Sequence, residues 1–342
     1  MTRPTIHDLA RAAGVSVATV NRVLAGAANV RVPTRQRVQE AAESIGFYGL
    51  GAIQSRGAAS RPKYRFGFLL HQGTRSFYRM LAQELAAAAR AVPDAGIDAR
   101  IEFLDDLSPQ NTAARLHEMG EKCDAVAVVA AVHPLVSAAL ESLRARGVPV
   151  FALISQLSAT GQVPYVGLDN WKVGRTAAWA VAQMAKAPGK VGILVGNHRY
   201  RCQDMNESGF RSYFREFAPG FTLLEPLLTF ESATIAQEMT ERLLRDHPDL
   251  VGLFVAGGGI TGALTALRAS RRAGQIVSVG FQLMDVTRTA LLDGVLTLVI
   301  SHPLADMARE TVAGMIRAVS QRDGEGNHTV VLPFALLGRE SI

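Results

Sequence analysis

From Tyr64 onward, short continuous apolar runs alternate with helical stretches, and this alternation constrains the fold more than any other feature of the sequence. Uninterrupted apolar runs of this kind are typical of strands that are buried on both faces. We expect strands at Arg65–Leu70, Ile101–Leu104, Ala125–Ala130, Val148–Leu153, Val191–Val195, Val251–Ala256, Ile276–Phe281 and Leu296–Ile300. Helices are expected between them, among others at Arg79–Ala91, Thr112–Glu121, Leu135–Arg146 and Ile235–Arg245. Repeating strand–helix units predict an α/β fold with mostly parallel sheets and helices on both faces.

The section 64–342 is longer than a typical single domain, so we expect it to form two lobes. Lobe 1 is predicted at about 64–166 and 297–326, and lobe 2 at about 167–296 and 327–342. In open parallel sheets, ligands bind at the carboxyl ends of the strands. We therefore expect a ligand crevice at those strand ends.

Residues 1–47 have a different pattern, that of three short helices, and predict a separate all-α headpiece. Thr5 can cap the first helix, and Asp8 completes a capping box with it. Gly14 ends this helix and Ser16 caps the second one.

The positive charge of the chain is concentrated at the same end. The net charge is +6, and residues 1–63 hold nine basic and three acidic side chains, which accounts for all of it. A basic excess in a small segment is typical of a polyanion-binding module, attached here to an electrically neutral body. A solvated basic surface is the alternative interpretation.

The stretch Leu9–Leu24 combines a helix, a tight glycine turn and a second helix, which is the pattern of a helix-turn-helix. The second helix would enter the major groove, where Arg pairs with guanine, Asn with adenine, and small apolar side chains pack on thymine methyl groups. Its outward side chains are Val17, Ala18, Asn21 and Arg22. A helical hairpin with a polar face is the alternative, but it does not explain this set within the basic segment. Phosphates are expected to be held by Ser16, Thr19, Asn29, Thr34 and Arg35.

Residues 5–47 closely resemble the DNA-binding headpiece of the lactose-repressor (LacI/GalR-type) family of bacterial transcription regulators. The resemblance is carried by the run Thr-Ile-His-Asp-Leu-Ala-Arg-Ala-Ala-Gly-Val-Ser-Val-Ala-Thr-Val-Asn-Arg-Val-Leu, which begins at Thr5. It implies a homodimer that binds a pseudo-palindromic DNA operator, with Val17, Ala18 and Arg22 as the main base readers. Asn21 stands where the family usually has serine, and it would contact either an adenine or a phosphate.

The connector 48–63 departs from this family. The resemblance implies a hinge helix, preceded by a Pro-Asn pair, that drives a leucine into the minor groove. This chain lacks the pair and has Arg56 where the leucine is expected, so either Ile53 is the wedge in a shifted register or Arg56 enters the groove. The glycines of the connector raise the cost of ordering a helix. The predicted DNA-binding residues are therefore Thr5, Ser16, Val17, Ala18, Thr19, Asn21, Arg22, Asn29, Thr34, Arg35, Ile53 and Arg56.

The section after the connector resembles the effector domain of the same family, which is similar to periplasmic sugar-binding proteins. The usual anchors have changed: Asn206 stands where the family commonly has Arg, and Gln282 where it has Asp. The glycines at 257–259 replace an Asn-Asp pair, and they serve either a tight turn or the approach of backbone amides to a ligand. We expect a hydroxyl-rich effector, such as a sugar or polyol, bound by His71, Phe77, Arg201, Asn206, Gln282 and His302.

The sequence contains no convincing catalytic, metal-binding or cofactor-binding constellation, so we do not expect an enzyme. His117 begins a His-Glu pair that lacks the second histidine of a zinc motif. Gly257, Gly259 and Gly262 match a Gly-x-Gly-x-x-Gly motif without the acidic residue that a dinucleotide site requires. Cys202 is either a reactive thiol beside two arginines or a structural cysteine.

An N-terminus without an apolar leader, together with two cysteines, indicates a reducing cytoplasm. The sequence thus predicts a cytoplasmic, homodimeric regulator, a repressor of carbohydrate or related catabolic genes, that responds to an inducer or a corepressor. Two alternatives are a solute-binding module with a vestigial headpiece and a sugar-processing enzyme built on the two-lobed section.

Overall fold

The computed structural model describes residues 4–25, 27, 30–47, 61–320 and 328–342. The chain divides into two compact units, one with the helical headpiece and one with the α/β section. The predicted DNA-binding positions Asn29, Ile53 and Arg56 lie outside the described residues.

Side-chain caps mark the starts of the first two headpiece helices. The helices are α1 (Ile6–Ala12), α2 (Val17–Leu24) and α3 (Val32–Ser44). Thr5 and Asp8 form the predicted capping box, in which the Thr5 backbone N–H donates to Asp8 Oδ2 over 2.9 Å. Gly14 turns the chain with a φ of +62°, and Ser16 Oγ accepts from the Thr19 backbone N–H over 3.2 Å. These caps satisfy backbone donors that the first turn of each helix leaves open.

The apolar faces of the three helices close on one small core. Its buried side chains are Leu9, Ala10, Ala13, Val20, Val23, Val30, Val38, Ala41, Ala42 and Phe47. Helix α2 contributes Val20 and Val23 to this core, and α3 contributes Val38. A core of this size stabilises a domain only marginally, so the caps contribute a large share of the headpiece's stability.

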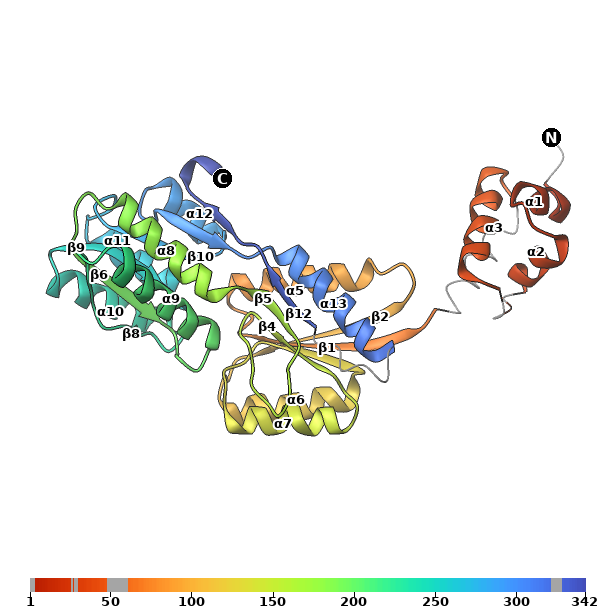
Figure 1. Cartoon of the computed structure of the whole chain (residues 1–342), viewed down its shortest axis with the longest axis horizontal. Coiled ribbons are helices and arrows are strands. Elements are labelled where there is room, and N and C mark those ends of the chain that lie inside the picture. Colours follow the sequence, from red (N-terminus) through yellow and green to blue (C-terminus); the bar gives the residue numbers. More distant parts are fainter. Residues whose placement is uncertain (1–3, 26, 28–29, 48–60, 321–327) are drawn as a thin grey trace. The chain divides into compact units, whose positions relative to one another are not determined.

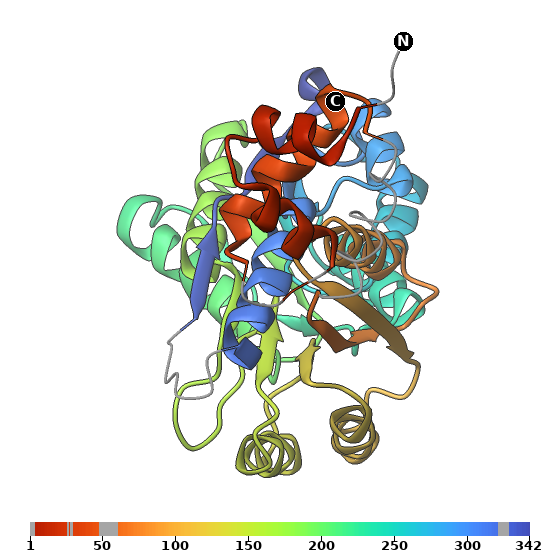
Figure 2. The same cartoon turned by 90° about the vertical axis from the view of Figure 1, so that its right-hand side faces the viewer.

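The first lobe of the α/β section is built on a sheet with the strand order β12-β5-β4-β3-β1-β2. The pairs β1–β3, β3–β4, β4–β5 and β5–β12 are parallel, as predicted. The strands are β1 (Lys63–His71), β2 (Gly96–Leu104), β3 (Ala125–Val128), β4 (Val150–Leu153), β5 (Tyr165–Leu168) and β12 (Thr329–Leu332). One face is covered by α5 (Ser76–Arg90) and α13 (Leu304–Ser320), and the other by α6 (Pro109–Lys122) and α7 (Pro134–Ala145) (Figures 1 and 2).

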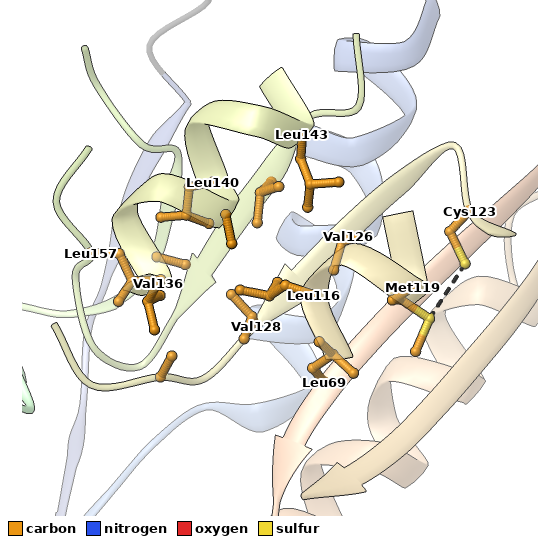
Figure 3. Packing of buried hydrophobic residues seen from close by; sticks show 14 of the residues in the cluster. Leu69, Leu116, Met119, Cys123, Val126, Val128, Val136, Leu140, Leu143 and Leu157 are labelled. Carbon is orange, nitrogen blue, oxygen red and sulfur yellow. Dashed lines mark hydrogen bonds between the residues drawn. The ribbon is translucent and has the colours of Figure 1, made fainter. Parts of the chain in front are cut away.

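Helices α6 and α7 pack on this sheet through a layer of aliphatic side chains (Figure 3). Leu116 and Met119 of α6, and Leu140 and Leu143 of α7, meet strand residues such as Val126. All are buried, with Leu116 and Val126 fully enclosed. This dry packing makes the first lobe a rigid support for the loops at its strand ends.

The second lobe is built on a sheet with the order β13-β11-β10-β9-β6-β7, and β8 also pairs with β6. The strands are β6 (Lys190–Val195), β7 (Thr222–Leu223), β8 (Leu227–Leu228), β9 (Leu250–Val255), β10 (Val277–Phe281), β11 (Leu298–Ser301) and β13 (Ala335–Leu337). The β11–β13 pair is antiparallel, and the others are parallel. Helices α8 (Asn170–Met184) and α9 (Arg201–Phe217) pack into one apolar cluster with the sheet, whereas α10 (Ala233–Asp246), α11 (Ile260–Ala269) and α12 (Asp285–Leu292) join another.

Two of the predicted lobe boundaries are wrong by one strand each. Strand β11 was predicted in lobe 1, but it pairs with β10 and continues the second sheet. Strand β12 falls in the segment predicted for lobe 2, but it pairs with β5 at the edge of the first sheet. The chain therefore crosses between the lobes after β5, after β11 and again between β12 and β13. The sequence pattern identifies strands, but it does not identify the partner beside which each one lies.

Candidate functional site: a helix-turn-helix surface and a cleft between two sheets

The surface of α2 carries the side chains that the sequence assigned to base reading. Ala18, Asn21 and Arg22 are exposed, whereas Val17 is half-buried against the headpiece core. Arg22 Nε donates to the backbone carbonyl of Ala18 over 3.3 Å, which holds the base of its guanidinium against the helix. The short Ala18 side chain and the two longer polar side chains lie on one exposed helix face, as a major-groove helix requires.

The other described residues of the predicted DNA-binding set form contacts within the headpiece itself. Ser16 Oγ and Thr19 Oγ1 lie 2.9 Å apart, within hydrogen-bond distance of each other. The Thr5 hydroxyl donates to Asp8 Oδ2 over 2.7 Å, and this hydrogen bond is the main cause that lowers the pKa of the Asp8 carboxyl. Arg35 donates to a backbone carbonyl over 3.5 Å, and Thr34 is half-buried on α3.

The second site is a cleft of about 600 Å³ in the α/β section. Its walls come from the carboxyl ends of strands in both sheets, as predicted: Val129 and Ile154 follow β3 and β4, and Gln282 and His302 follow β10 and β11. Aromatic, aliphatic, hydroxyl and amide side chains line it, together with glycines and two charged residues, Arg75 and Glu231. The amide-bearing lining residues are Gln72, Asn170, Gln203, Asn206 and Gln282.

An ion pair crosses this cleft between the two lobes. Arg75, which follows β1, donates from Nη1 to Glu231 Oε2 over 2.6 Å and from Nη2 to the Glu231 backbone carbonyl. Glu231 lies before α10, and its Oε1 also accepts from Gln203 Nε2 over 2.6 Å. Burial alone would raise the pKa of Glu231, but the Arg75 charge and these hydrogen bonds hold it below its usual value. The carboxylate is therefore ionised at neutral pH.

Asn206, which lines the cleft, carries a buried acceptor without a hydrogen-bond partner. The residue lies on α9 and lines the cavity, and only 2% of its surface is exposed. Its Oδ1 has no hydrogen-bond partner. Leaving a buried acceptor unpaired is unfavourable, so this oxygen is suited to a donor group of a ligand, such as a hydroxyl.

Gln282 and His302 are coupled at the end of the cleft that the second sheet provides. Gln282 Oε1 accepts from the backbone N–H of His302 over 3.0 Å, and His302 Nδ1 lies 3.3 Å from the same oxygen. Burial lowers the pKa of His302 to about 4, so the imidazole is neutral at pH 7. Since Nδ1 faces an acceptor, it carries the proton, and Nε2 is left as an acceptor. The ring of Phe77 lies beside this imidazole, with a centroid separation of 5.4 Å.

Of the six predicted effector residues, four line the cleft and two do not. Phe77, Asn206, Gln282 and His302 contribute to its wall. His71 is buried behind the wall, where its two ring nitrogens face the hydroxyls of Tyr78 and Tyr200 over 3.1 and 3.4 Å. Arg201 is exposed on the first turn of α9 and does not line the cavity.

The sequence interpretation missed Arg75, Glu231 and Gln203. Arg75 lies two residues before Phe77, which had been predicted to bind the effector, so its position in the sequence indicated a place near the ligand. Glu231 precedes α10 in a segment where no ligand loop had been predicted. Phe230 and Glu231 both have positive φ angles, 49° and 62°, a strained arrangement that sequence periodicity does not reveal.

The structure bears on two of the alternatives that the sequence leaves open. Cys202 is enclosed, and burial raises the pKa of its thiol to about 12, which favours the structural role over a reactive thiolate. Gly259 begins α11 with a φ of +101°, and a Cβ on Gly262 would lie 1.8 Å from the Ala233 carbonyl. These two glycines of the Gly-x-Gly-x-x-Gly match thus serve a turn and the close packing of two helices.

Across the described ranges, no three His, Cys, Asp or Glu side chains gather closely enough to hold a metal ion. Within the same ranges, none of the helices combines the length and apolar character needed to cross a membrane.

Comparison with known proteins assigns both parts of the chain. Residues 66–323 match the periplasmic binding protein domain, and residues 5–49 match the bacterial regulatory proteins of the lacI family. Catabolite control protein A of Priestia megaterium is 31% identical over 169 residues, which are 48% of this chain and 47% of that protein. The chain spans about half the length of this and the next curated relatives that it matches.

Other matches extend over nearly the whole chain or over its larger unit. The HTH-type transcriptional regulator pepR1 of Lactobacillus delbrueckii subsp. lactis is 23% identical over 98% of this chain and 97% of its own length. A solute binding protein of an ABC transporter from Agrobacterium vitis, solved with alpha-D-tagatopyranose, shares 20% identity. It aligns with a TM-score of 0.73 over 81% of this chain and 95% of its own length.

Proposed function

Since this chain belongs to the lacI family of bacterial regulatory proteins and carries a periplasmic binding protein domain, we propose that it regulates transcription by binding DNA under the control of a small effector. The headpiece binds DNA, and the cleft binds the effector. The protein acts in the cytoplasm as a homodimer, in which each headpiece reads one half of a pseudo-palindromic operator. It is a repressor of carbohydrate or related catabolic genes.

The observation that carries the DNA-binding role is the exposed face of α2. A capped helix-turn-helix presents Ala18, Asn21 and Arg22 to solvent in a segment that matches a family of DNA-binding regulators. A headpiece that had lost this function would have no reason to keep an Asn-Arg pair on that face. The matched regulator pepR1, which covers both units of the chain, further supports an intact regulator over a solute-binding module with a vestigial headpiece.

The cleft supports the effector role. It combines the unpaired Asn206 oxygen with the neutral His302 imidazole and the Phe77 ring, which suits a hydroxyl-rich compound with one apolar face. The solved solute binding protein of the same fold, bound with a sugar, supports this class of ligand. We propose binding rather than catalysis, because the lining holds no nucleophile paired with a base.

The two functions are coupled by thermodynamic linkage. If an effector binds more tightly to the state that does not bind DNA, it lowers the affinity for DNA, and DNA lowers the affinity for the effector by the same factor. A corepressor would instead raise the affinity for DNA, and DNA would raise the affinity for the corepressor by the same factor.

The experiment that tests this function starts from the full-length protein and a pool of random-sequence duplex DNA. Repeated selection should enrich a pseudo-palindrome, and binding to it should weaken steeply with salt, because phosphate contacts release counterions. Fluorescence anisotropy with the enriched duplex and a scrambled control gives the specificity ratio. Equal affinity for the two duplexes would refute the proposed regulator.

A further inference from the structure

The charge balance inside the cleft points to the class of effector that it accepts. Among the described residues that line the cavity, Arg75 and Glu231 are the ones that are ionised at neutral pH. Burial raises the pKa values of Tyr78, Tyr200 and Cys202 and lowers that of His302, so these four groups are neutral. The lining therefore carries one positive and one negative charge, and they neutralise each other.

The pair is held from several sides. The side chains of Arg75 and Glu231 are only 22% and 8% exposed. Glu231 Oε2 accepts from Arg75, while Oε1 accepts from Gln203 Nε2 over 2.6 Å and from the Gly258 backbone N–H over 3.4 Å. Arg75 in turn donates to both the side chain and the backbone of Glu231. Each charge thus has its main partner within the protein.

Glycines make the space in which the pair lies. A Cβ on Gly258 would lie 2.1 Å from Glu231 Oε2 and 2.8 Å from Arg75 Nη1. A Cβ on Gly196 would lie 1.8 Å from Glu231 Oε1. Gly196, which follows β6, and Gly258, which follows β9, therefore leave room for the Glu231 carboxylate. The ion pair is thus part of the architecture of the site and is not a chance surface contact.

We propose that the Arg75–Glu231 pair makes the cleft selective for an uncharged polyhydroxy effector and against the carboxylate or phosphate form of the same compound. This inference rests on the proposed effector function of the cleft. A neutral ligand leaves the pair intact and uses the unpaired Asn206 oxygen and the neutral His302. An anion that took Arg75 would leave Glu231 buried beside it, still held by Gln203, so that two negative charges would face each other.

In the opposite interpretation, the Glu231 carboxylate occupies the place of an anionic effector and is displaced from Arg75 when that effector binds. It requires the carboxylate to leave the cleft and to become solvated. The hydrogen bonds from Gln203 and Gly258, both of which lie on the same lobe as Glu231, act against this movement. The experiment below separates the two interpretations.

The first arm measures the ligand preference of the full-length protein by isothermal titration calorimetry. The probes are matched sets: the aldoses D-glucose, D-galactose and D-ribose with their alditols, aldonates and phosphates, and the ketose D-tagatose with its phosphate. We expect binding among the neutral compounds, and at least about 100-fold weaker binding of the charged counterpart of any compound that binds, because a buried pair must be broken. Equal or tighter binding of the charged form would overturn the inference and leave the proposed effector function intact.

The second arm does not depend on the identity of the effector. Glu231→Gln keeps the size of the side chain and leaves Arg75 as an unpaired cation in the cleft. At low millimolar concentration and constant ionic strength, where general salt effects on stability are the same for all variants, we expect sodium gluconate and sodium sulfate to raise the melting temperature of this variant but not that of the parent protein. The double variant Arg75→Gln/Glu231→Gln restores neutrality, so it should again show no response to anions. If Glu231→Gln does not fold, the calorimetric comparison of neutral and charged compounds decides the inference.

The outcomes of the two arms are distinguishable. If Glu231→Gln gains no anion response while the double variant folds normally, the pair does not control charge selectivity and the inference fails. If no probe of either class binds the parent protein, the effector function of the cleft fails as well. DNA binding, measured with the selected duplex, is independent of both results.

Discussion

A Cβ atom on Gly174 of α8 would lie 2.0 Å from the backbone carbonyl oxygen of Asn206 on α9. The converse contact lies one turn away, where a Cβ on Gly209 would lie 2.3 Å from the Trp171 carbonyl. The backbones of these two helices therefore touch at glycine, and this contact fixes the depth at which Asn206 faces the cleft. The packing of α8 against α9 therefore also determines the position of a residue of the candidate effector site.

Replacement of Gly174 by alanine tests this relationship. The added methyl group meets backbone rather than a flexible side chain, so α8 and α9 must separate, and we expect the free energy of unfolding to fall by about 1–3 kcal/mol. The chain has two tryptophans, Trp171 and Trp179, and both lie on α8, so their fluorescence in a urea titration reports this unfolding. Gly220→Ala is the matched control, because its Cβ would meet only Pro188 at an ordinary 3.5 Å. Equal stability of the two variants would show that α8 and α9 tolerate a side chain at their contact.

Asn206→Leu should separate stability from binding. The unpaired Oδ1 lowers the free energy of unfolding of the free protein. A side chain of similar size without polar atoms should therefore leave this free energy unchanged or raise it by about 1 kcal/mol, and the melting temperature should follow. Affinity for a neutral sugar identified by calorimetry should fall by about tenfold or more. Asn170→Leu is the contrasting variant, because Asn170 Nδ2 donates to Tyr165 and Leu168, and its loss should lower stability. A loss of stability in Asn206→Leu equal to that in Asn170→Leu would contradict the assignment of an unpaired oxygen.

Acidification should destabilise the α/β section between about pH 6.5 and pH 4. Burial lowers the pKa values of His71 and His302 to about 4, whereas unfolded histidine titrates near 6.5. The unfolded state therefore takes up protons first, and the stability that is present above pH 6.5 is lost as the pH falls. The loss is on the order of 3 kcal/mol for each histidine.

Glu231 adds a separate loss of stability at lower pH. Its pKa is held below the ordinary value, so its contribution is present above about 4.5 and is lost as the pH falls through the folded-state value. Urea titrations from pH 7 to pH 3 measure the combined effect. His71→Gln should flatten the slope between pH 6.5 and 4 while the loss below that range remains. An unchanged slope in this variant would mean that the imidazole is accessible to protons in the folded protein.

The fold was predictable from the sequence where a pattern is local. Apolar runs marked the buried strands, and cap residues such as Thr5 and Ser16 marked the helix starts, because both signals depend on neighbours within a few residues. The strands β5, β7, β8, β12 and β13 were not predicted. They lie at or near the edges of the two sheets, and β12, with the sequence Thr-Val-Val-Leu, takes its position only from its pairing with β5.

The candidate site was predictable only in part, for a related physical reason. Phe77, Gln282 and His302 follow strand ends, and parallel sheets bring such ends together, so topology alone indicates these residues. Glu231 reaches the cleft through two residues with positive φ, and its partner Arg75 lies far away in sequence on the other lobe. His71 was misassigned because a polar side chain at a strand end can point into the core as readily as into a cleft, and here two tyrosines hold it inside.

The last prediction concerns the base-reading face of α2. Arg22→Ala should lower the affinity for the selected operator by about 1–3 kcal/mol and relax the preference at one base position in each half-site. A bidentate contact to guanine needs the planar guanidinium, so Arg22→Lys should lose the same preference although it keeps the charge.

The charge control for this prediction is Arg37→Ala, which removes one charge from an exposed position of α3 outside the predicted DNA-binding set. It should weaken binding to the operator and to a scrambled duplex equally, and leave the base preference unchanged. Selection from the random pool with each variant, followed by anisotropy across a salt series, measures both quantities. If lysine at position 22 restores full specificity, Arg22 contacts a phosphate, and base reading must lie with Asn21 and the small residues beside it.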